Sequence, residues 1–221
     1  YTALINFAVA KKNSGQFIVR IEDTDRERFV EGAEEKILSS LKAYGISYDE
    51  GPDIGGPYAP YRQSERLPVY KKYAEELVEK GKAYYCFCNK ERLLELRKEQ
   101  MAKKQLPRYD KHCLLAVKDA SSRIARGEKY VVRLNVSPDK KVWFTDMIRG
   151  RIEFDSNLLD DQVLLKSDRF PTYHLGVVVD DHIMQISHII RAEEWISSTP
   201  KHIILYESFG WQIITISCLL N

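Results

Sequence analysis

The hydrophobic pattern of the chain changes twice along its length, and this change restricts the folds that it can adopt. Residues 17–22 alternate between apolar and polar side chains, as a strand does, and apolar residues over 33–44 and 70–78 recur at helical spacing. The middle of the chain begins with a helix that Asn89 is expected to cap and that runs to about Lys104.

The second half of the chain is dominated by strand signals until a final helix. Short β-rich runs are predicted at 130–136, 142–145, 151–154, 163–166, 172–179 and 184–190. A helix is then expected to begin at Thr199-Pro200, with Thr199 as its cap, and to end at Gly210. Flanks of α/β character around a centre that starts helical and turns β predict an α/β domain with a second, α+β domain inserted in it.

Composition is that of a globular protein and excludes several classes. The 221 residues suffice for one large or two small domains, and a formal net charge of +2 is too small to indicate nucleic-acid binding by itself. The longest near-apolar run, Ile213–Leu220, is far shorter than the roughly 18 residues of a membrane span, and the first residues show no secretion signal. Four cysteines do not form a dense disulfide framework. We therefore expect a cytoplasmic protein without a membrane partner.

A strongly charged segment follows the first predicted strand. Seven of the nine residues from Arg20 to Arg28 are charged. Carboxylates at the carboxyl end of a parallel strand lie where open α/β sheets bind ligands, so Glu22 is a candidate for a ligand ammonium group. The alternative is a helix N-terminus with acidic residues in its first turn, which needs no ligand.

Two further motifs follow predicted strands in the last third of the chain. The apolar run from Tyr173 ends in Asp180-Asp181-His182, which is compatible with a metal site or with internal hydrogen bonds. The run that ends at Ile190 continues as Arg191-Ala192-Glu193-Glu194-Trp195. An arginine fork fits a carboxylate and a tryptophan can form the wall of a pocket, but a structural ion pair with a buried tryptophan is also compatible.

Three cysteines have a spacing that can hold zinc. Cys86 and Cys88 are separated by one residue, and 24 residues lie between Cys88 and Cys113. A structural zinc site needs four ligands, and His112, Tyr109 or a water are the candidates for the fourth. The alternative is three small buried side chains without a metal.

Taken in order, these segments resemble the catalytic half of a bacterial-type glutamyl-tRNA synthetase. Each segment alone is a weak signal, but the ordered set is specific and covers nearly all of the chain to Trp211. The matching segments are 17–27, 51–53, 61–68, 84–86, 107–110, 164–168, 171–174, 178–182, 190–195, 198–200 and 209–211.

The resemblance implies a class I aminoacyl-tRNA synthetase. Its Rossmann-type catalytic domain would consist of residues 1–82 and 161–221, split by an inserted α+β acceptor-binding domain at 83–160. The implied reaction ligates L-glutamate to tRNA(Glu) through a glutamyl-adenylate, with ATP and Mg²⁺, for protein synthesis. We expect a monomer whose partners are tRNA(Glu), L-glutamate and ATP.

The resemblance also implies which residues contact the small substrates. Glu22 would pair with the ammonium group of glutamate, and Arg191 would pair with a carboxylate. Tyr173 and Trp195 would line the amino-acid pocket, and Glu194 would lie toward ATP. No catalytic residue is assigned within the chain.

The tRNA contacts are expected on two segments. By resemblance, Asp25 and Arg26 approach the acceptor end. The segment Lys90–Lys129 has 12 basic and 6 acidic residues. A solvated helical face is the commoner interpretation of such a run, but the resemblance favours RNA phosphates as its partner, with Lys103 and Lys104 as contacts.

The chain departs from the family pattern at three places. The Pro-x-Pro-x-Gly-x-x-His-x-Gly and Lys-Met-Ser-Lys-Ser signatures, which bind ATP, would lie before Tyr1 and after Asn221, so we expect residues 1–221 alone to be inactive. The tail at 212–221 is shorter than the family pattern and altered. Leu115 occupies the position of the fourth ligand in zinc-binding relatives.

Three alternatives remain at this stage. A truncated paralogue that glutamylates a tRNA base usually has a different acidic segment and a shorter insertion. A glutaminyl-tRNA synthetase is a further relative, although Arg191–Trp195 fits the glutamate enzyme better. A non-catalytic RNA-binding module would lack the ATP signatures altogether.

Overall fold

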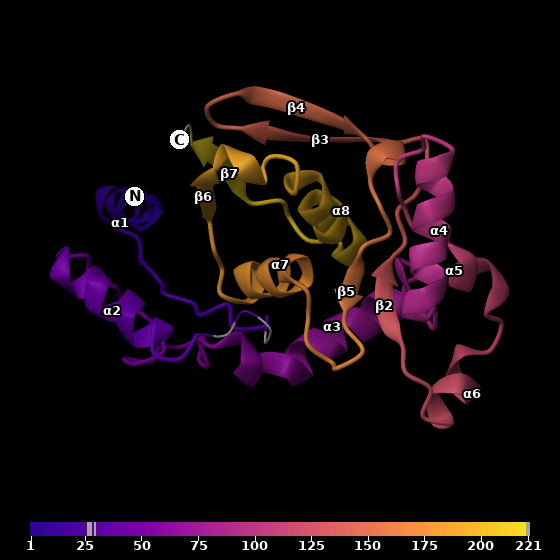
Figure 1. Cartoon of the computed structure of the whole chain (residues 1–221). Helices are drawn as coiled ribbons and strands as arrows, with labels where there is room; N and C mark the ends of the chain where they lie inside the picture. Colours follow the sequence, from indigo (N-terminus) through magenta and orange to yellow (C-terminus); the bar gives the residue numbers. More distant parts are fainter. Residues whose placement is uncertain (26–27, 29, 220–221) are drawn as a thin grey trace.

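Figure 1 shows the computed structural model of the chain, which describes residues 1–25, 28 and 30–219. Arg26, one of the two residues predicted near the tRNA acceptor end, therefore lies outside the described residues. The α-helices are α1 Thr2–Lys12, α2 Ala33–Ala43, α3 Leu67–Glu79, α4 Lys90–Ala102, α5 His112–Ala116, α6 Ala120–Ala125, α7 Tyr173–Ile183 and α8 Thr199–Phe209. The strands are β1 Ala83–Cys86, β2 Val131–Leu134, β3 Lys141–Asp146, β4 Gly150–Asp155, β5 Val163–Leu165, β6 His188–Ala192 and β7 Thr215–Leu219. Short 3₁₀ turns are η2 Gln63–Arg66, η3 Ser156–Leu158 and η4 Glu193–Trp195.

The strands form two sheets. One is antiparallel with the order β1-β2-β5, and the other has the order β4-β3-β7-β6. In the second sheet β6 and β7 run parallel over five residue pairs, and β3 joins β7 in parallel at Asp146 and Ile216. The buried Asp146 carboxylate strengthens this junction by accepting the backbone N–H of Cys218 at 2.7 Å. The altered tail at 212–221 thus contributes a strand to the sheet.

Two predicted strands differ in the structure. Residues 17–22 are extended but form only isolated parallel bridges, Ile18 with Glu50 and Ile21 with Arg62. The strand predicted at 172–179 is wrong, because these residues lie mostly in helix α7. Every α7 residue from Leu175 to Asp181 is buried, so the segment has no polar face to show the helical period.

The helix predictions hold with small changes. Asn89 caps α4, and its side chain accepts the N–H of Arg92 at 3.0 Å. Gly210 ends α8 in the left-handed conformation, at a φ of 79°. Thr199 is not the cap of α8 but its first helical residue, because its hydroxyl bonds to Arg191 and to the Trp195 carbonyl instead.

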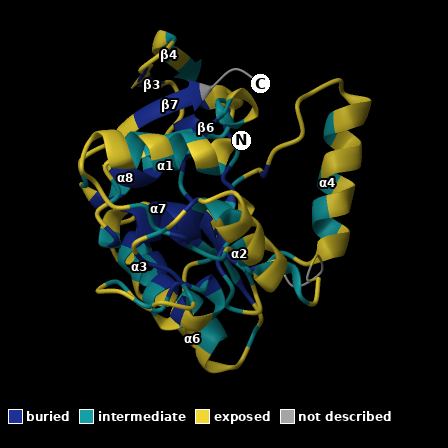
Figure 2. Cartoon of the chain, turned by 90° about the vertical axis from the view of Figure 1, so that its left-hand side faces the viewer, coloured by how far each residue is buried: buried dark blue, intermediate teal, exposed yellow. Residues whose placement is uncertain are grey.

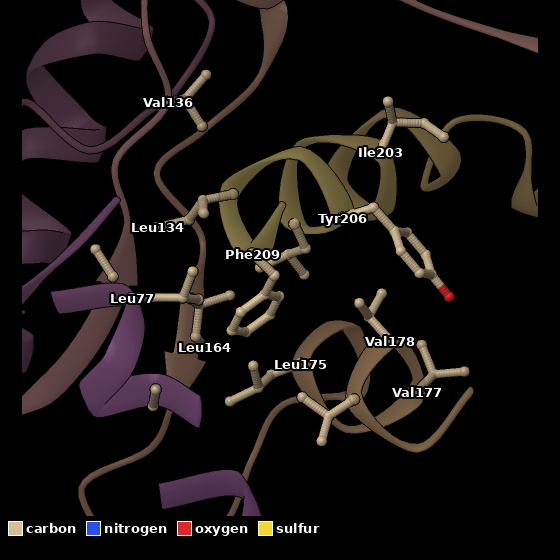
Figure 3. Close-up of a cluster of buried hydrophobic side chains, with 14 of the residues drawn as sticks. Leu77, Leu134, Val136, Leu164, Leu175, Val177, Val178, Ile203, Tyr206 and Phe209 are labelled. Carbon is tan, nitrogen blue, oxygen red and sulfur yellow. The ribbon is translucent and has the colours of Figure 1, made fainter. Parts of the chain in front are cut away.

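The main hydrophobic core lies where α3, α7 and α8 meet the three-stranded sheet β1-β2-β5. Figure 3 shows Leu77 of α3, Leu134 and Leu164 of the sheet, Leu175 of α7 and Phe209 of α8 directed toward one another. The first four of these side chains are fully buried. This cluster continues to Phe144 of β3 and Ile216 of β7, so strands of both sheets share one core.

The surface elements are less firmly packed. Figure 2 shows α4 standing apart from the main body with mostly exposed residues, while most of α7 and the middle of β7 are buried. No residue of α1 or α4 is fully buried. Across the described residues, no helix has the length and apolar character to cross a membrane.

A buried polar network joins η2 and α3 to α7. The Asp180 carboxylate is fully buried and accepts hydrogen bonds from Arg66 Nε at 2.8 Å, Gln63 Nε2 at 2.9 Å and the Tyr70 hydroxyl at 2.7 Å. A Cβ at Gly176 would lie 3.1 Å from Gln63 Nε2, so glycine leaves room for the Gln63 side chain to cross α7. Asp180 therefore serves internal hydrogen bonding, which was one of the two interpretations of the Asp-Asp-His motif.

Candidate functional site

Arg191 lies at the carboxyl end of β6, beside the parallel strand β7. It pairs in register with Cys218, and its side chain is 8% exposed. Ligands of open α/β sheets bind at this end of parallel strands. The sheet therefore places a buried guanidinium at the edge where a ligand is expected.

No carboxylate among the described residues lies within ion-pairing distance of Arg191. One terminal nitrogen donates to the Thr199 hydroxyl at 2.6 Å, and the other lies 3.4 Å from His202 Nδ1. The Nε–H group is buried and has no hydrogen-bond partner within the part of the chain that the structure describes. A buried cation with neutral neighbours and an unused donor is costly unless a ligand supplies the negative charge. This arrangement suits a bound carboxylate.

Two aromatic side chains lie next to the guanidinium. The Tyr173 and Trp195 rings are 4.8 Å apart between centroids, and the Trp195 centroid lies 6.0 Å from the Arg191 guanidinium carbon. Burial and then the neighbouring Glu22 carboxylate raise the pKa of Tyr173, so its hydroxyl stays protonated at neutral pH. The structure thus brings together Tyr173, Arg191 and Trp195, with Glu22 close enough to act on Tyr173.

Glu22 is held by Arg20. A terminal nitrogen of Arg20 donates to Glu22 Oε1 at 3.2 Å, and the other donates to Asp181 Oδ1 at 2.9 Å. Burial alone would lower the pKa of Arg20, but Asp181, Glu22 and Asp180 together raise it. The Glu22 side chain remains 37% exposed, so its carboxylate can still meet a ligand cation.

The remaining predicted contact residues lie on the surface. Glu194 is exposed in η4, next to the aromatic pair. Asp25 is exposed and forms an ion pair with Arg28 at 2.6 Å. Lys103 and Lys104 are exposed at the end of α4, away from Arg191.

The three cysteines of the predicted metal site come together. The sulfur atoms of Cys86, Cys88 and Cys113 all lie within 4.8 Å of one another, and those of Cys88 and Cys113 are 3.5 Å apart. The Tyr109 hydroxyl lies 3.4 Å from the sulfur of Cys86 and 3.3 Å from that of Cys88. Burial raises the pKa of the Cys88 thiol to about 11 in the metal-free protein. Of the three candidates for a fourth donor, Tyr109 is the one whose oxygen bonds to the sulfur atoms.

Sequence reasoning missed four side chains that support these groups. Arg20 appeared only as part of a charged run, and Thr199 only as a helix cap. His174 lies within the matching segment 171–174 without a role of its own, and His202 lies in none of the matching segments. The weak signal for His202 is its place on α8, three residues after Thr199, which puts both on the helix face toward Arg191.

Comparisons with known proteins identify the family of the chain. Residues 1–221 match the family described as tRNA synthetases class I (E and Q), catalytic domain. The glutamate–tRNA ligase of Fusobacterium nucleatum is 54% identical over 213 residues, which are 96% of this chain and 42% of that protein. That of Dehalococcoides mccartyi is 55% identical over 210 residues, which are 95% of this chain and 42% of that protein.

Solved structures give the same result for the fold. The glutamate–tRNA ligase of Elizabethkingia meningosepticum, solved in complex with its amino acid, superposes with a TM-score of 0.93 at 40% identity. The match covers 99% of this chain and 45% of that protein. The α/β class and the Rossmann-type character predicted from the sequence are therefore confirmed. The chain belongs to the catalytic-domain family of class I tRNA synthetases for E and Q, and it spans less than half the length of the relatives named above.

Proposed function

We propose that the protein ligates L-glutamate to tRNA(Glu) in an ATP-dependent reaction through a glutamyl-adenylate. The observation that carries this proposal is the buried Arg191 guanidinium, which has no carboxylate partner among the described residues and an unused Nε–H donor. The names of the relatives and of the superposed structure support glutamate as the amino acid.

The four side chains around this position match the groups of glutamate. Arg191 offers N–H donors to one carboxylate, and Glu22 offers a carboxylate to the ammonium group. Tyr173 and Trp195 form an aromatic wall for the aliphatic part of the substrate. Glutamine carries the same ammonium and α-carboxylate groups as glutamate, so the two amino acids differ for this pocket only at the side-chain carboxylate, which glutamine lacks.

The chemistry of activation follows from the substrates. The α-carboxylate of glutamate attacks the α-phosphorus of ATP, a mixed anhydride forms, and pyrophosphate leaves with the electron pair of the broken P–O bond. A ribose hydroxyl of the tRNA end then attacks the acyl carbon and releases AMP. Mg²⁺ would neutralise phosphate charge during this transfer. Glu194, exposed beside the pocket, is our candidate for the side toward ATP.

Glutamate-dependent exchange of labelled pyrophosphate into ATP, measured in the presence of tRNA, tests this activation step. The protein expressed from its complete reading frame should catalyse exchange with glutamate and not with glutamine. We infer that residues 1–221 alone do not, because the two ATP signatures of the family are not among them.

We further propose that residues 83–160 bind the acceptor end of the tRNA, together with Asp25 and Arg26. The basic residues of this segment, including Lys103 and Lys104 at the exposed end of α4, support a surface that meets RNA phosphates. We also propose that the enzyme is a cytoplasmic monomer, which would bind the tRNA without a further protein partner.

Replacing Lys103 and Lys104 together by glutamate should weaken tRNA binding and reduce its salt dependence. Each lost phosphate contact lowers the slope of log K against log salt by about 0.7–0.9. Filter binding at several salt concentrations measures this slope. The control is the double change Lys71→Glu and Lys72→Glu on α3, which should leave it unaltered. An unchanged slope in the Lys103 and Lys104 variant would contradict the phosphate contacts and favour the interpretation of this segment as a solvated helical face.

We also propose that Cys86, Cys88, Cys113 and Tyr109 hold one structural Zn²⁺. Tetrahedral bonds of about 2.3 Å to sulfur place zinc-bound sulfur atoms roughly 3.8 Å apart, close to the separations in this cluster. The cluster joins β1, the loop before α4 and α5, so the metal would tie these elements together. Zinc would also deprotonate the thiols, which overrides the raised pKa of Cys88.

Metal analysis of the protein purified without chelators should find about one zinc per chain. Cys113→Ser should remove most of this zinc, because three donors hold the ion far more weakly than four. Cys218→Ser is the matched control, since Cys218 is a buried cysteine of β7 outside the cluster. Equal zinc content in both variants, or no zinc in the parent protein, would contradict the metal site.

A further inference from the structure

His202 lies directly behind the Arg191 guanidinium. It is 2% exposed on α8, and its Nδ1 atom is 3.4 Å from a terminal nitrogen of Arg191. Its other ring nitrogen, Nε2, is 3.0 Å from Nδ1 of His174 on α7. The two histidines and Arg191 thus form a chain of nitrogen atoms at hydrogen-bond distances between two helices and β6.

The donors and acceptors along this chain follow from the chemistry of the groups. A guanidinium can only donate, so Nδ1 of His202 must accept from Arg191. The proton of a neutral His202 is then on Nε2, which donates to Nδ1 of His174. His174 must therefore carry its own proton on Nε2. Because Arg191 can only donate, it determines the tautomers of both His202 and His174.

Both rings are neutral in this arrangement. Burial, together with smaller effects of the nearby Lys201 and Arg191 charges, lowers the pKa of His174 to about 4. Burial and then Arg191 hold the pKa of His202 well below its ordinary value. A neutral acceptor orients the guanidinium without cancelling its charge, whereas an aspartate or glutamate here would compete with a bound carboxylate.

Thr199 completes the support on the second terminal nitrogen. Its hydroxyl accepts from Arg191 at 2.6 Å and lies 3.1 Å from the Trp195 carbonyl oxygen. His202 and Thr199 thus each accept one N–H group, from different terminal nitrogens of Arg191. The guanidinium has five N–H groups, and the Nε–H is one that these two contacts leave unused.

We propose that His202, backed by His174, is a positioning residue that orients Arg191 for the carboxylate of the amino-acid substrate through a chain of neutral imidazole rings. This proposal rests on the proposed function, because it assumes that Arg191 binds the substrate carboxylate. It adds a role for the buried His202 and the half-buried His174, which make no contact with the substrate themselves.

The kinetic test uses His202→Leu and His202→Asn in the protein expressed from its complete reading frame. Leucine removes the acceptor, so KM for glutamate should rise roughly 10-fold to 100-fold, as expected for one hydrogen bond to a charged group. KM for ATP should stay unchanged. Asparagine offers an acceptor near the Nδ1 position and should restore most of the glutamate affinity. Ile203→Val, at a fully buried neighbour on α8, is the control for packing.

The outcomes separate positioning from packing. Equal loss in the leucine and asparagine variants would mean that shape alone matters and would overturn the proposal. A leucine variant that behaves like Ile203→Val would also overturn it.

Nitrogen-15 NMR of histidine-labelled protein tests the tautomers without any substrate. At neutral pH, Nδ1 should be unprotonated and Nε2 protonated in both His202 and His174. A proton on Nδ1 of His202, or a charged ring, would overturn the proposal. If the parent protein fails to use glutamate, the proposed function fails, and the proposed role toward substrate fails with it. The NMR spectrum would then still show whether the histidine chain supports Arg191.

Discussion

Replacing Arg191 by alanine should raise KM for glutamate by at least about 30-fold, and by 1,000-fold or more if the carboxylate is fully enclosed. Truncating one partner of a buried, hydrogen-bonded charge pair costs about 2–5 kcal/mol, and each 1.4 kcal/mol corresponds to a factor of ten. The measurement is steady-state aminoacylation at varied glutamate with saturating ATP and tRNA. KM for ATP serves as the internal reference and should change little.

Two companion variants test the cause of this loss. Arg191→Lys keeps the charge but loses the planar fork, so it should recover only part of the affinity. Arg191→Met removes a buried charge that has no anionic partner among the described residues, so without substrate it should unfold at the same or a higher temperature than the parent protein. Near-normal glutamate kinetics in Arg191→Ala would contradict the assignment of this residue to the substrate.

Replacing Asp180 by alanine should lower the free energy of unfolding by about 3–5 kcal/mol. The change leaves the guanidinium of Arg66, which is only 4% exposed, without its carboxylate partner. It also removes the acceptor of the Tyr70 hydroxyl and of the Gln63 amide. Urea unfolding monitored by tryptophan fluorescence gives the difference, and the melting temperature should fall by on the order of 10 °C.

Glu75→Ala provides the matched control on α3. Glu75 forms an exposed ion pair with Lys71 at 3.7 Å, and such pairs contribute about 0–1 kcal/mol. If Asp180→Ala were as mild as Glu75→Ala, the buried network would contribute little to the fold. The attachment of η2 and α3 to α7 would then need another explanation.

The elements that could be predicted from the sequence are those with a polar and an apolar face or a clear cap. The cap at Asn89 and the end of α8 at Gly210 depend on local chemistry, and both are confirmed. Helix α7 was missed because its run of three valines favours a strand and its burial on all sides hides the helical period. Its helical state depends on packing against α3 and α8, which a local pattern does not contain.

The residues of the candidate site also fall into two groups, those that could be identified from the sequence and those that only the structure reveals. Glu22, Arg191 and Trp195 were identified because they lie in motifs that resemble a known family, and their roles remain predictions. His202 lies in an apolar helix and carries no motif, so only the fold shows that it lies behind Arg191. The choice of Tyr109 among three candidate donors likewise required the loop before α5 to be placed beside β1.

A tRNA charging assay with labelled glutamate and, separately, labelled glutamine tests the central claim most directly. The protein expressed from its complete reading frame is incubated with ATP, Mg²⁺ and a tRNA pool, and acid-precipitable label is counted before and after mild base. We predict label from glutamate alone, released by base, because the product is an ester on the tRNA end. Label that resists base, label from glutamine, or no label from either amino acid would contradict a glutamate–tRNA ligase.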